Sequence, residues 1–119
     1  MSCTIFYKGA LKDSHGIKAF NSIAEKYAVK LDCKMLVNNN RITLFLKDKS
    51  EHLVFDFVDN RIDSFCKWNN LDDPQEFYTI LDLFIEIKPL FKSLKVEDDK
   101  GAWHSYVIQN TGLWGGATR

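Results

Sequence analysis

The chain has 119 residues, 45% of them hydrophobic and 27% charged, a size and composition typical of one folded domain. Aromatic residues make up 13% of it, which argues against disorder, and no apolar run approaches the roughly 20 residues of a membrane span. A net charge of zero argues against a nucleic-acid partner. Residues 1–7 lack the basic and apolar regions of a secretory signal. We therefore expect a single cytoplasmic domain over residues 1–119, without membrane or nucleic-acid partners.

The first predicted elements are a strand and an amphipathic helix. Residues 3–8 have strand composition, and Gly9 closes them. Asp13 and Ser14 are capping residues, and apolar side chains then recur at helical spacing over about 14 residues. The stripe consists of Ile17, Phe20, Ile23, Ala24, Tyr27 and Ala28.

Four further strands are predicted, over residues 31–37, 41–47, 52–58 and 61–68. Their connections are short, and Asn38-Asn39-Asn40 and Asp59-Asn60 are strong turn signals because Asn tolerates positive φ. Such connections favour an antiparallel meander. A two-residue Asp59-Asn60 turn places Asp56 opposite Asp63 and Leu53 opposite Cys66.

A second helix has a clear start signal. Asp73-Pro74-Gln75-Glu76 offers an N-cap residue, a proline at the first helical position and a glutamate at the third. Pro89 is expected to kink or end this helix, so we predict helix over residues 74–87 and a last turn or short helix to about residue 94. Its buried stripe is predicted to be Phe77, Ile80, Leu81, Phe84, Ile87 and Phe91.

The C-terminal part is predicted to be a short strand over residues 95–97, a turn over 98–101 and a final strand over 102–108. Residues 110–119 contain three glycines and are expected to be a flexible tail unless Trp114 anchors it. The order βαββββα, with one further strand as an option, predicts an α+β fold. In this fold, two helices pack on one face of an antiparallel sheet of about five strands.

Charge is distributed unevenly along the chain. Residues 1–50 hold nine Lys/Arg and four Asp/Glu, whereas residues 51–99 hold five Lys/Arg and twelve Asp/Glu. The hairpin around Asp59 would gather several carboxylates, either as a solvated face, as a face for a basic partner, or as a cation site. Trp is frequent in binding hot spots. The candidate partner-binding residues are therefore Glu51, Asp56, Asp59, Asp63 and Trp68.

Familiar catalytic and metal motifs are missing from the sequence. Cys3, Cys33 and Cys66 match neither a disulfide framework nor a metal pair, and we expect reduced core thiols. Asp98, Asp99 and His104 could act as acid and base or bind a cation, but Asp-Asp-Lys-Gly is typical of a turn. We expect no enzymatic activity, no catalytic residue, no cofactor and no metal.

The stretch Ile5-Phe6-Tyr7-Lys8-Gly9-Ala10-Leu11-Lys12-Asp13, followed by a helix carrying Ile23-Ala24, resembles the start of small uncharacterised bacterial proteins. Size and layout also resemble the single-domain immunity proteins of bacterial toxin systems. The first resemblance implies no activity. The second implies a protein that neutralises a toxin by binding it, and neither resemblance assigns functional residues.

Two functions therefore remain open, with homodimerisation in a structural role as a third alternative. The first is a non-enzymatic protein-binding domain, most concretely an immunity protein that covers a basic toxin. The second is a small-ligand-binding or hydrolytic domain with a pocket between sheet and helices, which would use Asp98, Asp99, His104 and Cys66.

Overall fold

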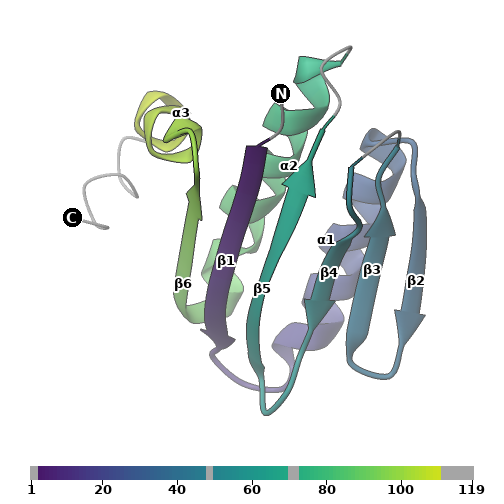
Figure 1. Cartoon of the computed structure of the whole chain (residues 1–119). Helices are drawn as coiled ribbons and strands as arrows, with labels where there is room; N and C mark the ends of the chain where they lie inside the picture. Colours follow the sequence, from purple (N-terminus) through teal and green to yellow (C-terminus); the bar gives the residue numbers. More distant parts are fainter. Residues whose placement is uncertain (1–2, 48–49, 70–72, 111–119) are drawn as a thin grey trace.

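The computed structural model describes residues 3–47, 50–69 and 73–110, so Trp114 and most of the expected C-terminal tail lie outside the described residues. Figure 1 shows strands in one layer with helices behind them. The elements are β1 (Cys3–Leu11), α1 (Gly16–Lys30), β2 (Lys34–Asn38), β3 (Arg41–Phe45), β4 (Leu53–Asp56), β5 (Arg61–Trp68), α2 (Pro74–Ile87), the 3-10 helix η1 (Lys88–Leu90), β6 (Phe91–Asp98) and α3 (Ala102–Asn110).

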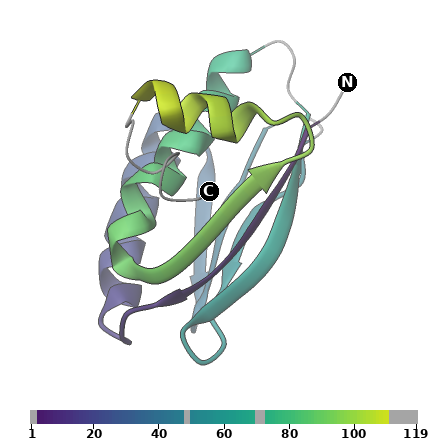
Figure 2. The same ribbon diagram turned by 90° about the vertical axis from the view of Figure 1, so that its left-hand side faces the viewer.

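The predicted α+β class is confirmed, but the single sheet of about five strands is wrong. The described strands form two antiparallel sheets of three strands, in the orders β5-β1-β6 and β2-β3-β4. The predicted meander therefore holds for β2, β3 and β4, whereas β5 leaves it to pair with β1. Helices α1 and α2 cover one face of both sheets, and α3 lies beyond the end of β6 (Figures 1 and 2).

The Asp59-Asn60 turn is confirmed, although the strand pairing expected beyond it is not. Both residues have positive φ, 52° and 65°, and Val58 pairs with Arg61 across the turn. Beyond this bridge β4 pairs with β3 and β5 pairs with β1. The carboxylates of Asp56 and Asp63 therefore face cations on their own sheets, which removes the like-charge contact that the hairpin register predicted.

One hydrophobic core fills the space between the strands and the helices. Alternate residues of β1 point inward, with Ile5 and Tyr7 almost fully buried. The predicted α1 stripe is confirmed, since Phe20, Ala24, Tyr27 and Ala28 are buried. Ile17 and Ile23 are half-buried against the same core.

The predicted helix start is confirmed, with Asp73 at the N-cap position and Pro74 after it. The contacts of the Asp73 and Glu76 side chains, however, differ from the expected cap. Asp73 makes no side-chain cap hydrogen bond. Glu76 is buried and its carboxylate accepts a hydrogen bond from Trp68 Nε1 at 2.8 Å. The third helical position therefore anchors the end of β5 to α2.

The expected secondary structure after Pro89 is wrong in two places. Residues 91–94 belong to β6 rather than to a helix, so Phe91 reaches the core from a strand whose Leu94 and Val96 are also buried. Residues 102–110 form α3 rather than a final strand. Four described groups donate hydrogen bonds to the Asp98 carboxylate, and three of these donors are backbone amides that hold the start of this helix.

None of the helices in the described part of the chain is both long and apolar enough to cross a membrane.

Candidate functional site

The outer face of the sheet β5-β1-β6, opposite to α1 and α2, carries an exposed aromatic pair. Phe6 on β1 and Phe65 on β5 are cross-strand partners, and their ring centroids lie 6.1 Å apart. The two residues are 45% and 56% exposed. They alternate with buried Ile5, Tyr7 and Cys66, so the period of the strands directs both rings away from the core. This aromatic pair is a hydrophobic contact surface at the middle of an open sheet face.

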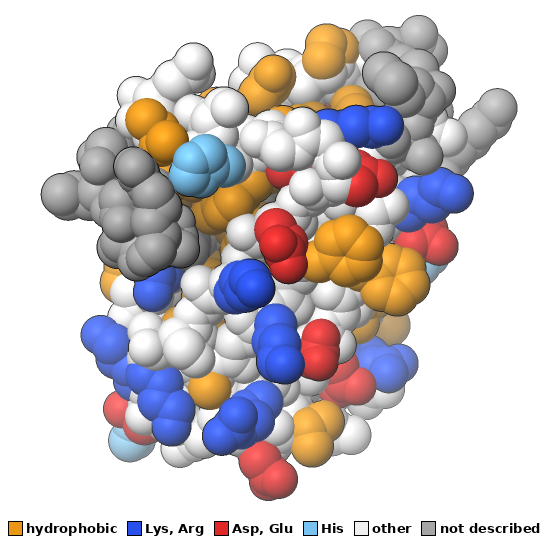
Figure 3. Space-filling model, turned by 60° about the vertical axis from the view of Figure 1, so that its left-hand side comes forward, with side chains coloured by type: hydrophobic (Ala, Val, Ile, Leu, Met, Phe, Trp, Pro, Cys, Tyr) orange, Lys and Arg blue, Asp and Glu red, His pale blue; other side chains and the backbone are white. Residues whose placement is uncertain are grey.

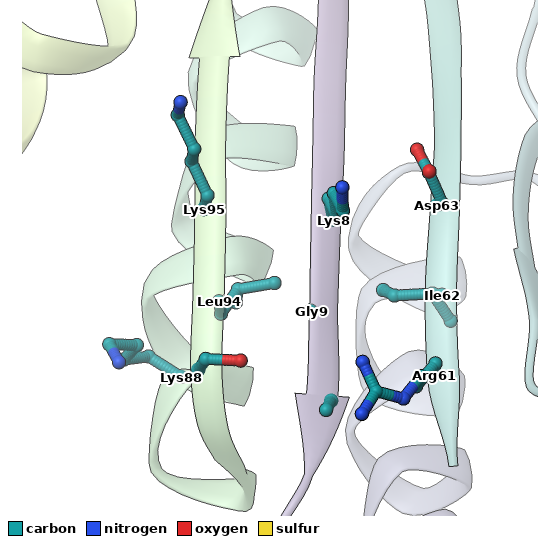
Figure 4. A pocket seen from close by; sticks show the side chains of 10 residues that line it. Lys8, Gly9, Arg61, Ile62, Asp63, Lys88, Leu94 and Lys95 are labelled. Carbon is teal, nitrogen blue, oxygen red and sulfur yellow. The ribbon is translucent and has the colours of Figure 1, made fainter. Parts of the chain in front are cut away.

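A hollow of about 630 Å³, here named the Gly9 hollow, lies next to the aromatic pair. On the outer face of β1, Ala10 follows Lys8 and leaves little side-chain volume between Arg61 and Ser93. A Cβ atom at Gly9 would lie 2.4 Å from the Ser93 backbone oxygen, so the close approach of β1 and β6 requires glycine here. Its lining residues are Lys8, Gly9, Ala10, Arg61, Ile62, Asp63, Lys88, Ser93, Leu94 and Lys95 (Figure 4).

The charged lining of the Gly9 hollow is mostly positive. Lys8, Arg61, Lys88 and Lys95 contribute cations, and Asp63 is the single carboxylate of the lining. Figure 4 shows the Arg61 side chain extending from β5 toward β1, with Lys8 on the central strand. In Figure 3, Lys and Arg side chains gather over the lower part of this surface, close to exposed hydrophobic side chains.

Two lysines face each other across this hollow. Lys8 on β1 and Lys95 on β6 are direct cross-strand partners, an arrangement that is unfavourable for like charges. Lys95 has one ion pair, with Glu97 on its own strand at 3.9 Å. Within the described ranges, Lys8 and Arg61 form no ion pair. Arg61, which aligns with Ala10, has neither an ion pair within these ranges nor a carboxylate opposite it in the strand register, so it leaves positive charge in the hollow.

The carboxylates predicted to form an acidic edge are largely engaged by neighbouring groups. Asp56 forms an ion pair with Arg41 at 3.2 Å. Asp63 lies opposite Lys8 in the strand register. The Glu51 carboxylate accepts a hydrogen bond from the Lys67 backbone amide at 3.1 Å.

The two remaining predicted partner-binding residues occupy very different environments. Asp59 is exposed at the tip of the hairpin. Trp68 is only 6% exposed, packs against the Phe77 ring and donates a hydrogen bond to Glu76. The structure therefore brings together no acidic patch containing all five residues, and it places Trp68 in the core.

Asp98, Asp99 and Cys3 lie close together, but their polar atoms stabilise a helix start. Asp98 Oδ1 accepts from the Trp103 amide at 2.7 Å, and Oδ2 accepts from the amides of Lys100 and Ala102 at 3.0 and 3.1 Å. The Cys3 thiol also donates to Oδ2, at 3.4 Å, and Asp99 accepts from the Thr4 amide at 3.1 Å. Burial, followed by the hydrogen bonds to Asp99 and Asp98, raises the pKa of the Cys3 thiol. The cluster therefore caps the start of α3, and the Cys3 thiol in it stays protonated.

The other predicted chemical groups do not converge with this cap. His104 is exposed on α3, and His52 packs its ring on Phe45 at 4.5 Å. Cys66 is fully buried, and burial, followed by the charges of Glu51 and Glu76, raises its pKa to about 12. Cys66 and Asp98 both align with Ile5, from opposite sides of β1, which separates them by roughly 10 Å.

No protein-family model matches this chain, and no curated protein or solved structure matches it at a significant level.

Sequence reasoning missed the outer-face residues Phe6, Lys8, Arg61, Phe65 and Lys95. Strand alternation in residues 3–8 separates Phe6 and Lys8 from Ile5 and Tyr7, and this signal was available in the sequence. A glycine inside a strand also indicates close approach of a second backbone. The sequence does not indicate which face of the strands the helices cover, or that β5 and β6 both flank β1.

Proposed function

We propose that this chain is a non-enzymatic protein-binding domain that contacts its partner through the outer face of the sheet β5-β1-β6. The observation that carries the proposal is the exposed cross-strand pair of Phe6 and Phe65 at the middle of that face. Truncating an aromatic anchor surrounded by polar residues typically costs more binding energy than truncating its neighbours.

The surroundings of the aromatic pair support a specific contact surface. Lys8, Lys95, Asp63 and Glu97 line a shallow hollow of about 280 Å³ beside the two rings. A hydrophobic centre with a charged rim is the usual composition of a protein interface. The charged rim would exclude wrong partners and set the orientation of the right one.

The polarity of this face changes the expected chemistry of the partner. The sequence favoured a basic toxin because of the carboxylates around Asp59, but Asp56, Asp63 and Glu51 have intramolecular partners or cross-strand cations. The charges directly beside the aromatic rings balance, whereas the lining of the adjoining Gly9 hollow is mostly positive. We therefore propose a partner that presents an acidic surface to Lys8 and Arg61. An immunity protein that covers an acidic region of a toxin is the specific form of this proposal.

The experiment compares partner capture by the tagged full chain, the double variant Phe6→Ser with Phe65→Ser, and the control Val29→Ser. Val29 is 81% exposed on α1, so its substitution also removes an exposed apolar side chain, but away from the proposed face. We expect the wild type and Val29→Ser to retain the same host protein and the double variant to lose it. The identified protein is then purified, and its affinity for the three chains is measured directly.

Two outcomes would contradict the proposal. Equal capture by all three chains would show that the aromatic pair is not the contact. A dimer of the wild type in light scattering that dissociates in the double variant would assign this face to a second copy of the chain instead. For the immunity form, co-expression with the captured protein should restore growth of cells that the protein alone inhibits.

A further inference from the structure

We infer that the Gly9 hollow binds a carboxylate-rich peptide segment of the partner, with Lys8, Arg61 and Lys95 as the groups that hold its carboxylates. This inference rests on the proposed function and names the chemistry of the ligand at one part of the same face. It concerns charge recognition in the hollow, whereas the proposed function depends on the aromatic pair.

The first argument is the arrangement of cations around the hollow. Lys8 and Lys95 are cross-strand partners on β1 and β6, and Arg61 reaches toward β1 from the other side (Figure 4). An anion between these groups would relieve the repulsion between the two lysines. Arg61 presents a planar fork of donors that matches a carboxylate, and it forms no ion pair within the described residues.

The second argument is space. The hollow has a volume of about 630 Å³, and small residues form its floor on the central strand. Gly9 is required for the close approach of β1 and β6, which fixes the relative position of the two strands that carry the hollow. The hollow therefore has room for side-chain carboxylates of an extended peptide next to its cations.

The third argument is continuity with the aromatic pair. Lys8, Asp63 and Lys95 line both the Gly9 hollow and the smaller hollow beside Phe6 and Phe65. A peptide that places acidic residues over Gly9 would bring its next residues to the two rings. The occupant is thus an acidic segment with an adjacent apolar residue.

A peptide fits this surface better than a nucleic acid. Asp63 and Glu97 lie beside the aromatic rings, where they would repel the phosphates of a strand whose bases stacked on Phe6 and Phe65. The whole chain also has no net positive charge to attract a polyanion from a distance. A peptide can place its negative charges over the hollow alone.

The test is a titration of the ¹⁵N-labelled full chain with a synthetic oligoglutamate peptide, followed by amide chemical shifts. The variant Lys8→Gln with Arg61→Gln is compared with Lys18→Gln with Lys34→Gln, two exposed lysines outside the hollow. We expect shifts around Gly9 and Arg61, and about fivefold weaker binding in the first variant, because each lost exposed ion pair contributes modestly. The control should differ less than about twofold from the wild type. Added salt should weaken binding of the wild type.

Equal weakening by both double variants would overturn the inference, because it would indicate attraction by net charge alone. Tighter binding of an oligothymidine through the same amides would assign the hollow to nucleic acid instead. Partner capture separates this inference from the proposed function. If Lys8→Gln with Arg61→Gln leaves peptide binding unchanged while Phe6→Ser with Phe65→Ser abolishes capture, only the hollow assignment fails. If Lys8→Gln with Arg61→Gln weakens peptide binding while Phe6→Ser with Phe65→Ser leaves capture unchanged, the proposed function fails and the anion site in the hollow stands.

Discussion

The hydroxyl of Tyr7 donates a hydrogen bond to the Val54 carbonyl oxygen at 2.6 Å and accepts one from the Val54 amide at 3.2 Å. Tyr7 belongs to β1 and Val54 to β4, so a side chain of one sheet completes the backbone hydrogen bonding of the other. This contact occupies the gap where β4 and β5 diverge after their hairpin. Between the Val58–Arg61 bridge and the hydrogen bond from the Glu51 amide to the Lys67 carbonyl oxygen, the Tyr7 hydroxyl links the two sheets where β4 and β5 form no strand ladder.

Removing that hydroxyl should destabilise the protein. Tyr7→Phe keeps the ring packing on Phe55 and Phe84 but leaves the part-buried amide and carbonyl of Val54 without this partner. We expect a loss of about 1–3 kcal/mol in the free energy of unfolding, measured by urea denaturation. Tyr78→Phe is the control, because Tyr78 is exposed, and it should change stability by less than about 0.5 kcal/mol. Equal effects of the two variants would contradict the bridging role.

Gly9 should tolerate no side chain. Gly9→Ala places a Cβ atom against the Ser93 backbone oxygen, which is part of β6 and cannot rotate away. We expect a loss of about 1–3 kcal/mol in stability and faster hydrogen exchange at the amides that pair β1 with β6. At Gly16 the nearest atom to a new Cβ is a Leu11 side-chain methyl at 3.2 Å, which can shift. A Gly16→Ala variant as unstable as Gly9→Ala would refute this explanation.

The start of α3 should depend on the Asp98 carboxylate. Asp98→Ala removes the acceptor for the Trp103, Ala102 and Lys100 amides, and we expect a cost of about 1–2 kcal/mol with loss of helical circular dichroism. Asp98→Asn keeps one side-chain oxygen and should recover part of the loss. Glu97→Ala is the matched control, since Glu97 is exposed and points to the outer face. The prediction fails if Asp98→Ala and Glu97→Ala behave alike.

Alkaline pH should remove a stabilising contribution of Tyr106. Burial, followed by the hydrogen bond and charge of Asp82, raises the pKa of Tyr106 to about 12 from its ordinary value of 10.0. Because the folded state has the higher pKa, this contribution is complete below about pH 10 and is lost as the pH rises toward 12. Tyr106→Phe lacks both the titration and the 2.6 Å bond to Asp82 Oδ1. The stability difference between wild type and variant should therefore shrink between pH 10 and 12, and a constant difference would contradict this assignment.

The parts of the fold that local patterns determine could be predicted from the sequence. The α1 stripe, the α2 start at Pro74 and the Asp59-Asn60 turn each depend on neighbouring residues and are present in the structure. The assignment of Phe91 to the stripe of α2 is wrong because its four-residue spacing from Ile87 also fits a helix, whereas the strand pairing with β1 decides the conformation. Likewise α3 requires Asp98 as a cap, and sequence reasoning treated that residue as part of a turn.

The candidate site was less predictable because it depends on which strands become neighbours. Carboxylates close together in the sequence suggested an acidic edge. In the structure, Asp56 forms an ion pair with Arg41 on the neighbouring strand β3, and Asp63 aligns with Lys8 on the neighbouring strand β1. Lys8 and Lys95 come from opposite ends of the chain and meet only through the pairing of β1 with β6. Their charge becomes visible as a patch once this long-range pairing is known.

The central place of β1 in its sheet determines the order in which the chain can fold during synthesis. Strands β2, β3 and β4 follow one another closely and can pair as soon as they leave the ribosome. β1 is synthesised before them, but its pairing partners β5 and β6 are synthesised later. Pairing of these strands with the two edges of β1 closes long loops. During this interval both edges of β1 and its apolar residues lack their partners. The nascent chain is therefore expected to be most prone to aggregation before residues 91–98 emerge.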